Sequence, residues 1–146
     1  MEIKAADVMK LRKMTGAGMM DCKKALQEAE GDFERAKDII REKGKLVVAK
    51  RSDRTATEGV VVTKIVDQKA YILCLACETD FVAQNVEFGA SATAILDVAV
   101  AADAADRDAL MAAKNEAGNT VEEMVTEKSG QTGEKVELAY YARIEA

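Results

Sequence analysis

Residues 59–77, GVVVTKIVDQKAYILCLAC, decide the fold of this chain. They contain two runs of apolar, largely β-branched residues, 59–66 and 69–77, and this composition is typical of β-strands. The polar pair Asp67 and Gln68 separates the two runs, a spacing that predicts a β-hairpin. Because both runs are apolar on both faces, we expect the strands to lie in the middle of a sheet or under helices.

Helical and strand patterns follow the hairpin. Apolar residues return at helical spacing over 82–104, and shorter helical patterns lie near 106–114 and 120–128. A final run, 134–145, alternates apolar with more polar residues, which predicts a third strand. Residues 59–146 therefore predict an α+β subdomain, a small three-stranded antiparallel sheet with helices on one side. The apolar face of the third strand would carry Val136, Leu138, Tyr140, Ala142 and Ile144.

The first 43 residues show three short amphipathic patterns. Apolar residues recur at steps of three or four over 5–14, 19–29 and 32–43, which gives each helix one face to bury. Asp32 is a good N-cap for the third helix. We therefore predict a compact three-helix bundle over 1–43. Its buried stripes would contain Val8, Leu11 and Met14, then Met19, Cys22, Leu26 and Ala29, then Phe33, Ala36 and Ile40.

Residues 44–58 carry mostly Lys, Arg, Ser, Asp and Thr around one short apolar patch, 46–49. This composition predicts a linker, or a brief helix, between the bundle and the subdomain. The expected organisation is thus a bundle over 1–43, a linker over 44–58 and an α+β core subdomain over 59–146.

Length and composition limit the class of protein. With 146 residues, the chain has room for about one domain and a small appendage. The first ten residues, MEIKAADVMK, are charged throughout, unlike a signal peptide, and no segment approaches the ~20 apolar residues of a membrane span. Three cysteines, an odd number without a disulfide framework, fit a reducing compartment. We expect a cytoplasmic protein without a membrane partner.

The net charge of -5 is unevenly distributed. Residues 1–54 carry 14 Lys and Arg against 10 Asp and Glu, whereas residues 55–146 carry 7 against 16. The basic segment 41–54 could contact phosphates, but it has no interleaved aromatic residues and belongs to an acidic protein. A solvated helix and linker explains this segment better, so we expect no nucleic-acid partner.

The chain lacks the residues that most enzymes use. It contains no His, which removes the commonest general base and the commonest metal ligand. Cys74 and Cys77 form a C-x-x-C motif, but residues three apart on a strand point to opposite faces, and no second pair completes a metal site. The stretch GQTGEK (130–135) has the wrong spacing for a phosphate-binding loop and precedes a strand, so we interpret it as a turn. We expect no enzyme activity, no metal and no cofactor, and a protein that works by contact.

The stretch CETDFVAQN (77–85) lies between a predicted strand and a predicted helix. Thr79 is a natural N-cap, and Asp80 would place its charge at the positive end of the helix dipole. The residues alone favour a buried Phe81, because large aromatic side chains are mostly buried. Met19 and Met20 cannot both face one core, so at least one is expected on the surface, where an adaptable Met suits a protein partner.

Two stretches, LRKMTGAGMMDCKKAL (11–26) and CETDFVAQN (77–85), resemble the bacterial elongation factor Ts family, the guanine-nucleotide exchange factors of elongation factor Tu. The resemblance covers essentially the whole chain. It implies that 1–43 is a ubiquitin-associated-like bundle and that the second stretch lies at the tip of the core subdomain. It also implies a translation elongation factor that promotes GDP release by disturbing the Mg²⁺ and phosphate region of its partner, without a catalytic base.

The same resemblance assigns contacts with elongation factor Tu to residues of this chain. Asp80 and Phe81, within the T-D-F-V run from Thr79 to Val82, would reach the partner, with Phe81 wedging between helices beside the Mg²⁺ site. An exposed Phe81 is therefore implied, against the expectation from the residues alone. Four further residues match the amino-terminal contact surface of the family: Arg12, Met19, Met20 and Lys23.

Most members of the family continue with a second, related core half and a helical hairpin, whereas this sequence stops at Ala146. Two alternatives stay open, a piece of a longer member and a short member with one core subdomain. A three-stranded sheet with helices on one side would leave two edges and an apolar face uncovered. In longer relatives the second core half packs there, and in some short members a second copy does, so the resemblance implies at least a weak homodimer through the sheet of residues 59–146. A rival interpretation is an adaptor whose ubiquitin-associated-like bundle docks peptides, with Phe81 in the core.

Overall fold

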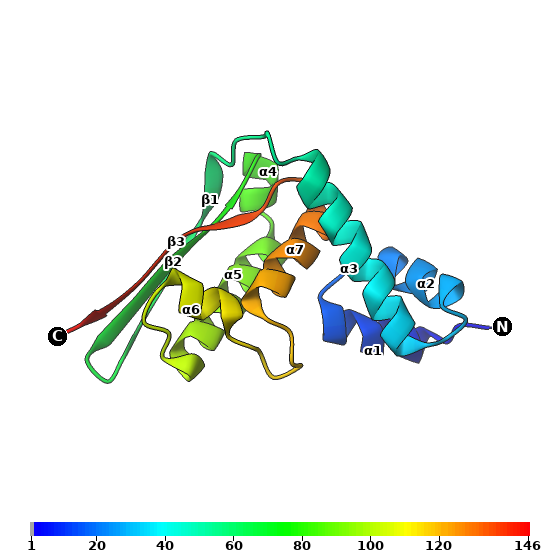
Figure 1. Cartoon of the computed structure of the whole chain (residues 1–146), viewed down its shortest axis with the longest axis horizontal. Helices are drawn as coiled ribbons and strands as arrows, with labels where there is room; N and C mark the ends of the chain where they lie inside the picture. Colours follow the sequence, from blue (N-terminus) through cyan, green and yellow to red (C-terminus); the bar gives the residue numbers. More distant parts are fainter. Residues whose placement is uncertain (1) are drawn as a thin grey trace.

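The computed structural model describes residues 2–146 (Figure 1). One antiparallel sheet has the strand order β1-β2-β3, with β1 (Glu58–Val66), β2 (Lys69–Cys77) and β3 (Glu137–Glu145). The helices are α1 (Ala5–Thr15), α2 (Met19–Glu28), α3 (Phe33–Lys50), α4 (Asp80–Ala83), α5 (Val86–Ala102), α6 (Arg107–Ala112) and α7 (Val121–Thr132). Three amino-terminal helices followed by an antiparallel sheet packed with helices confirm the predicted α+β class.

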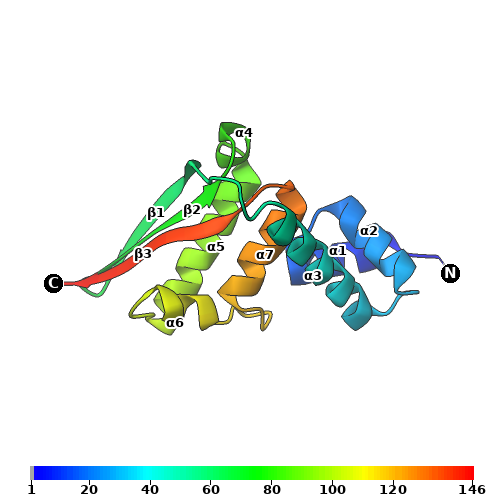
Figure 2. The ribbon, with the colours of Figure 1, turned by 45° about the horizontal axis from the view of Figure 1, so that its top comes forward.

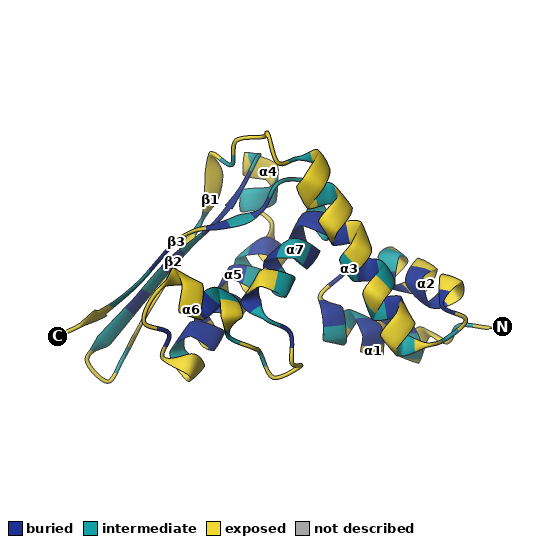
Figure 3. Ribbon diagram, in the orientation of Figure 1, coloured by how far each residue is buried: buried dark blue, intermediate teal, exposed yellow. Residues whose placement is uncertain are grey.

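Helices α5, α6 and α7 lie on one side of the sheet, and α3 leads from the sheet to α1 and α2 (Figures 1 and 2). Buried residues concentrate between the sheet and these helices, and again among α1, α2 and α3 (Figure 3). The other face of the sheet is open, because Val61, Ile65, Tyr140 and Ile144 are exposed there. Strand β2 is central, as predicted, but β1 is an edge strand with an uncovered face. Within residues 2–146, no helix is both long and apolar enough to cross a membrane.

The main core joins the inner face of β2 to α5 and α7. Tyr71, Leu73 and Leu75 alternate along β2, and all three are buried. Helix α5 meets them with Phe88 and Ile95, which are almost fully enclosed. Burying a large apolar side chain contributes roughly 1.5–3 kcal/mol, so this row of contacts is a major source of stability for the subdomain.

A β-bulge in β3 changes which residues face the core. Opposite β2, strand β3 accommodates one extra residue, Ala139. The core-facing side therefore passes from Leu138 to Tyr141, both of which are buried. The predicted apolar face through Tyr140 and Ile144 is wrong, because the bulge turns these two side chains to the open face.

The three amino-terminal helices bury a core of their own, which includes Val8, Leu11, Cys22, Leu26, Ala36 and Ile40. Helix α1 stops at Gly16, which adopts the left-handed conformation (φ 77°) that glycine tolerates best. The Asp32 side chain accepts hydrogen bonds from the first backbone amides of α3, at 3.0 and 3.3 Å, as predicted for an N-cap.

Helix α3 continues into the segment predicted as a linker. It ends at Lys50, so residues 44–50 are helical and residues 51–57 form the connection to β1. The first half of the expected linker is therefore the end of α3 and not a separate brief helix. The division of the chain into two domains remains a prediction.

Close packing against α7 explains the extension of α3. Gly44 and Gly130 allow the two backbones to approach, since a Cβ on Gly44 would lie 2.6 Å from the Thr126 carbonyl oxygen. Arg41 adds an ion pair of 2.6 Å with Glu123 of α7. Tertiary contacts of this kind override the weak helix propensity of a local sequence.

The single helix expected over 82–104 is divided into α4 and α5. Asn85 makes the division, because its side chain accepts a hydrogen bond of 2.8 Å from the Glu87 amide and so begins a new helix. Helix α7 is longer than predicted and runs to Thr132. Half of the GQTGEK stretch is therefore helical, and the turn begins only at Gly133.

Candidate functional site

The T-D-F-V run forms one helical turn directly after β2. Thr79 is the N-cap of α4, and its hydroxyl accepts a hydrogen bond from the Val82 amide at 3.4 Å. Val82 packs against the main core, whereas Asp80 is exposed and Phe81 is 85% exposed. The burial of Phe81 expected from the residues alone is therefore wrong, and its exposure agrees with what the family resemblance implies. We call Asp80 and Phe81 the tip.

Glu134, in the turn between α7 and β3, holds the start of α4. Its Oε1 accepts hydrogen bonds from the backbone amides of Glu78 and Thr79, both at 3.1 Å. Its Oε2 accepts a hydrogen bond of 2.6 Å from the Thr79 hydroxyl. One carboxylate thus satisfies three donors, and hydrogen bonds to an ionised acceptor are stronger than those between neutral groups.

Glu78, directly before Thr79, connects the same segment to Arg51 and to the turn that contains Glu134. Its carboxylate accepts hydrogen bonds from Arg51 Nε at 3.0 Å, from Arg51 Nη2 at 2.9 Å and from the Lys135 backbone amide at 2.6 Å. The hydrogen bond from Arg51 is the main cause that holds the pKa of Glu78 below its usual range. Arg51 is the C-cap of α3, so the segment before the tip is tied both to α3 and to the turn before β3.

Glu134, Glu78 and Arg51 are absent from the predicted site. Each is a charged residue beside a turn or a helix end, and such residues are most often solvated. No local spacing in the sequence brings the 130–135 stretch to the T-D-F-V run, since only the sheet register does so. Their contribution became visible through tertiary contacts alone.

Arg12 of α1 is engaged within the chain. Its Nη2 lies 2.7 Å from Glu87 Oε1 in the first turn of α5. Glu87 also accepts a hydrogen bond of 3.3 Å from Gln131, and it lines a hollow of about 340 Å³ beside Phe81. Arg12 therefore connects the amino-terminal helices to the region of the tip, with part of its charge already neutralised.

Met19, Met20 and Lys23 are exposed at the start of α2, with Met20 at 63%. Met19 was expected on the buried stripe, but it is the first residue of α2 and extends past the core of the three helices. Within residues 2–146, no hydrogen bond or ion pair joins these three side chains to the tip. The structure therefore brings Arg12 toward the tip region but not Met19, Met20 or Lys23.

Cys74 and Cys77 lie on opposite faces of β2, as their spacing predicts. Cys77 is buried in the main core, and burial raises the pKa of its thiol to about 11. Burial also raises the thiol pKa of half-buried Cys74 and of buried Cys22. In the part of the chain that the structure describes, no group of three or more His, Cys, Asp or Glu is placed to hold a metal ion.

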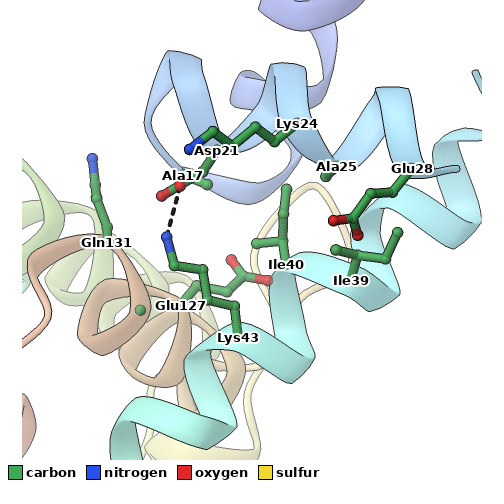
Figure 4. A pocket seen from close by; sticks show the side chains of 11 residues that line it. Ala17, Asp21, Lys24, Ala25, Glu28, Ile39, Ile40, Lys43, Glu127 and Gln131 are labelled. Atoms are coloured by element: carbon green, nitrogen blue, oxygen red, sulfur yellow. Dashed lines mark hydrogen bonds and ion pairs between the residues drawn. The ribbon is translucent and has the colours of Figure 1, made fainter.

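A cleft of about 330 Å³ between α2, α3 and α7 contains none of the predicted contact residues (Figure 4). An ion pair of 2.6 Å between Lys43 and Asp21 spans it. Glu127 lies at the α7 side, 5% exposed, and burial raises the pKa of its carboxyl to about 7. The nearest cation is Arg41, whose Nε lies 3.9 Å from Glu127 Oε1. Glu127 is thus a buried acid at the joint between α3 and α7.

The tip is the feature that most suggests a function. An exposed aromatic side chain on a braced segment is typical of a protein that acts by binding another protein, because aromatic anchors dominate many interfaces.

Comparisons with known proteins identify the family. The family model described as Elongation factor TS matches residues 78–146. The chain is 53% identical over 145 residues to the Elongation factor Ts of Parabacteroides distasonis, an alignment that covers 99% of this chain and 44% of that protein. It is 49% identical over 144 residues to that of Porphyromonas gingivalis, covering 99% of this chain and 53% of the relative. It is 50% identical over 141 residues to the Elongation factor Ts of Streptomyces ramocissimus, an alignment that covers 95% of this chain and 51% of the relative.

The chain belongs to the elongation factor Ts family. It spans about half the length of the curated relatives that it matches.

Proposed function

We propose that this chain binds the GTPase elongation factor Tu and promotes the release of GDP from it. The observation that carries the proposal is the exposure of Phe81, at 85%, on a braced turn in a member of the elongation factor Ts family. A side chain that must enter a partner has to be free before contact. The anchoring of Thr79 and the inward packing of Val82 support this geometry, since they leave Asp80 and Phe81 as the groups that project.

The proposed mechanism breaks no covalent bond. A GTPase holds its nucleotide through backbone groups around the phosphates and through a Mg²⁺ ion. Phe81 would insert its ring between elements beside that ion, and Asp80 would add a negative charge that competes for hydrogen-bond donors there. Both effects weaken GDP binding, so the chain acts by binding energy and not as an enzyme.

The amino-terminal helices would provide a second area of contact. Met20, Met19 and Lys23 are exposed at the start of α2, and the flexible thioether side chain of Met adapts to a partner surface. Arg12 would act mainly within the chain, through its ion pair with Glu87. This area would dock the partner, while the tip would act on the nucleotide site.

Binding to nucleotide-free elongation factor Tu, with and without excess GDP, tests the proposal. Linkage requires that GDP lowers the affinity for the chain by the same factor by which the chain lowers the affinity for GDP. We expect capture of Tu by the immobilised chain and its release by GDP. Capture that GDP does not reverse would favour the adaptor instead, and no capture would contradict the proposal. Phe81→Ala should weaken capture, whereas Ile65→Ala, an exposed apolar residue on the open sheet face, should not.

A further inference from the structure

The GQTGEK stretch (130–135) lies against the segment that carries the tip. Its first half is the last turn of α7, and Gly133 then ends the helix in the left-handed conformation (φ 73°). Directly after this reversal, the Glu134 carboxylate binds two backbone amides and the Thr79 hydroxyl. The 130–135 stretch, which the sequence predicts to be only a turn, is thus hydrogen-bonded to the residues directly before the tip.

The turn that contains Glu134 is held against α7 on one side and against the end of α3 on the other. The Val136 amide donates a hydrogen bond of 3.1 Å to Ser129 Oγ, which closes the turn onto α7. Lys135 Nζ donates a hydrogen bond of 3.3 Å to the Ser52 carbonyl, just beyond α3. The Lys135 backbone amide binds the carboxylate of Glu78. These bonds fix the turn in the frame of α3 and α7.

Helix α4 is too short to set its own orientation. It has four residues, and a single isolated helical turn is unstable in water. Its one side-chain cap, a hydrogen bond that the Val82 amide donates to the Thr79 hydroxyl, is long at 3.4 Å. The carboxylate of Glu134 accepts three shorter hydrogen bonds from the residues directly before α4, at 2.6 to 3.1 Å, and these are the main polar contacts that hold the start of the helix.

We infer that Glu134 is a positioning residue: its carboxylate fixes the direction of Asp80 and Phe81, and thereby sets the rate at which a bound GTPase loses GDP. The inference rests on the proposed function. A pre-positioned group acts without first having to be ordered, and a small misplacement of such a group is costly in rate. The Thr79 cap found from the sequence is half of this arrangement, and Glu134 is the other half.

The test is single-turnover release of a fluorescent GDP from elongation factor Tu, with the chain in excess over a range of concentrations. In Glu134→Ala we expect the maximal release rate to fall roughly tenfold, because the tip is no longer held in place. Glu134→Gln keeps one oxygen that can accept from the two amides, so its rate should lie between those of Glu134→Ala and the unchanged chain. The concentration giving half the maximal rate should change less than about twofold, since the surface of α2 is untouched.

A merely structural effect would give a different pattern. Loss of folded protein lowers the active concentration, which shifts the half-maximal concentration but leaves the maximal rate intact. Glu137→Ala is the matched control, because Glu137 is a half-buried acid three residues further on that makes no hydrogen bond to α4 in the described residues. If Glu134→Ala does not fold, Thr79→Val and Thr79→Ser give the same comparison, since only Ser keeps the hydroxyl.

A second measurement needs no partner. Backbone ¹⁵N order parameters of Asp80 and Phe81 should fall in Glu134→Ala from about 0.85, typical of rigid backbone, to below about 0.6. Unchanged order parameters, or an unchanged maximal rate, would overturn the inference, and slow release in Phe81→Ala would then leave the proposed function standing. A chain that does not speed GDP release at all would overturn the proposed function, and the order parameters would then decide alone whether Glu134 positions the tip.

Discussion

The hydroxyl of Thr79 donates a hydrogen bond of 2.6 Å to Glu134, a residue 55 positions later in the chain. The bond joins the segment after β2 to the turn before β3. Thr79 therefore combines a local task, capping α4, with a tertiary one. The anchoring of the segment before the tip therefore depends on a contact between distant parts of the chain.

Replacing Phe81 should leave stability unchanged. Its ring is 85% exposed, so Phe81→Ala removes little buried surface, and we expect a change within about 0.5 kcal/mol in the free energy of unfolding. Phe88→Ala is the matched control, because Phe88 is 1% exposed and its loss should cost roughly 3–5 kcal/mol. Urea denaturation of both variants measures the difference. Equal destabilisation by the two changes would place Phe81 in the core and support the adaptor interpretation.

The crossing of α3 and α7 should be intolerant of a single methyl group. Gly44→Ala would place a Cβ 2.6 Å from the Thr126 carbonyl oxygen, so the two helices must separate, at a cost of roughly 1–3 kcal/mol. Gly89→Ala is the control, because Gly89 lies in α5 with open space where a Cβ would project. Gly89→Ala should raise the free energy of unfolding by about 0.5–1 kcal/mol, the usual gain of Ala over Gly in a helix. Thermal unfolding that is equally affected by both changes would contradict this packing.

Glu127 should make stability depend on pH. Burial raises the pKa of its carboxyl from 4.5 to about 7. Among the neighbouring charges, the cation Arg41 lowers this pKa, the acid Glu123 raises it and the cation Lys37 lowers it. Below pH 4.5 the group is protonated in both the folded and the unfolded chain and has no effect. As pH rises toward about 7, the unfolded chain ionises first, so the folded state loses up to about 3 kcal/mol.

Glu127→Gln removes this titration. The variant should therefore match the unchanged chain at pH 4 and exceed it in stability at pH 8. Urea denaturation at both values measures the difference between the two proteins. A variant that is less stable at pH 8 would show that the ionised carboxylate is a net stabilising partner of Arg41.

We propose that the open face of the sheet supports weak self-association. Val61, Ile65, Tyr140 and Ile144 are exposed on it, and clustered exposed apolar side chains commonly mark contact surfaces. Sedimentation equilibrium should show an average mass that rises above the monomer with concentration. Ile144→Lys should abolish the rise, whereas Val86→Lys, at an exposed position outside the sheet, should not. A monomer at every concentration would contradict the proposal.

The sequence predicts the local structure of this chain better than its tertiary contacts. The hairpin of β1 and β2, the caps Thr79 and Asp32 and the three amino-terminal helices follow from residue type and spacing, because each depends on neighbours in the chain. The bulge at Ala139 and the length of α3 do not, since sheet pairing and the contact with α7 determine them.

The candidate site divides in the same way. The T-D-F-V run is recognisable as a motif, but its residues alone predicted a buried Phe81, because exposure depends on which neighbour packs inward. Here Val82 does so. The contribution of Glu134 depends on a contact across 55 residues, which no local pattern encodes.

The rate of GDP release from elongation factor Tu, followed by stopped-flow with a fluorescent nucleotide, tests the central claim most directly. The unchanged chain should accelerate release, and Phe81→Ala should lower the maximal rate at least about tenfold while remaining folded. Asp80→Ala should also slow release, and Ile65→Ala should not. Release that is equally fast with Phe81→Ala, Asp80→Ala and the unchanged chain would contradict the assignment of the tip as the group that acts on the nucleotide site.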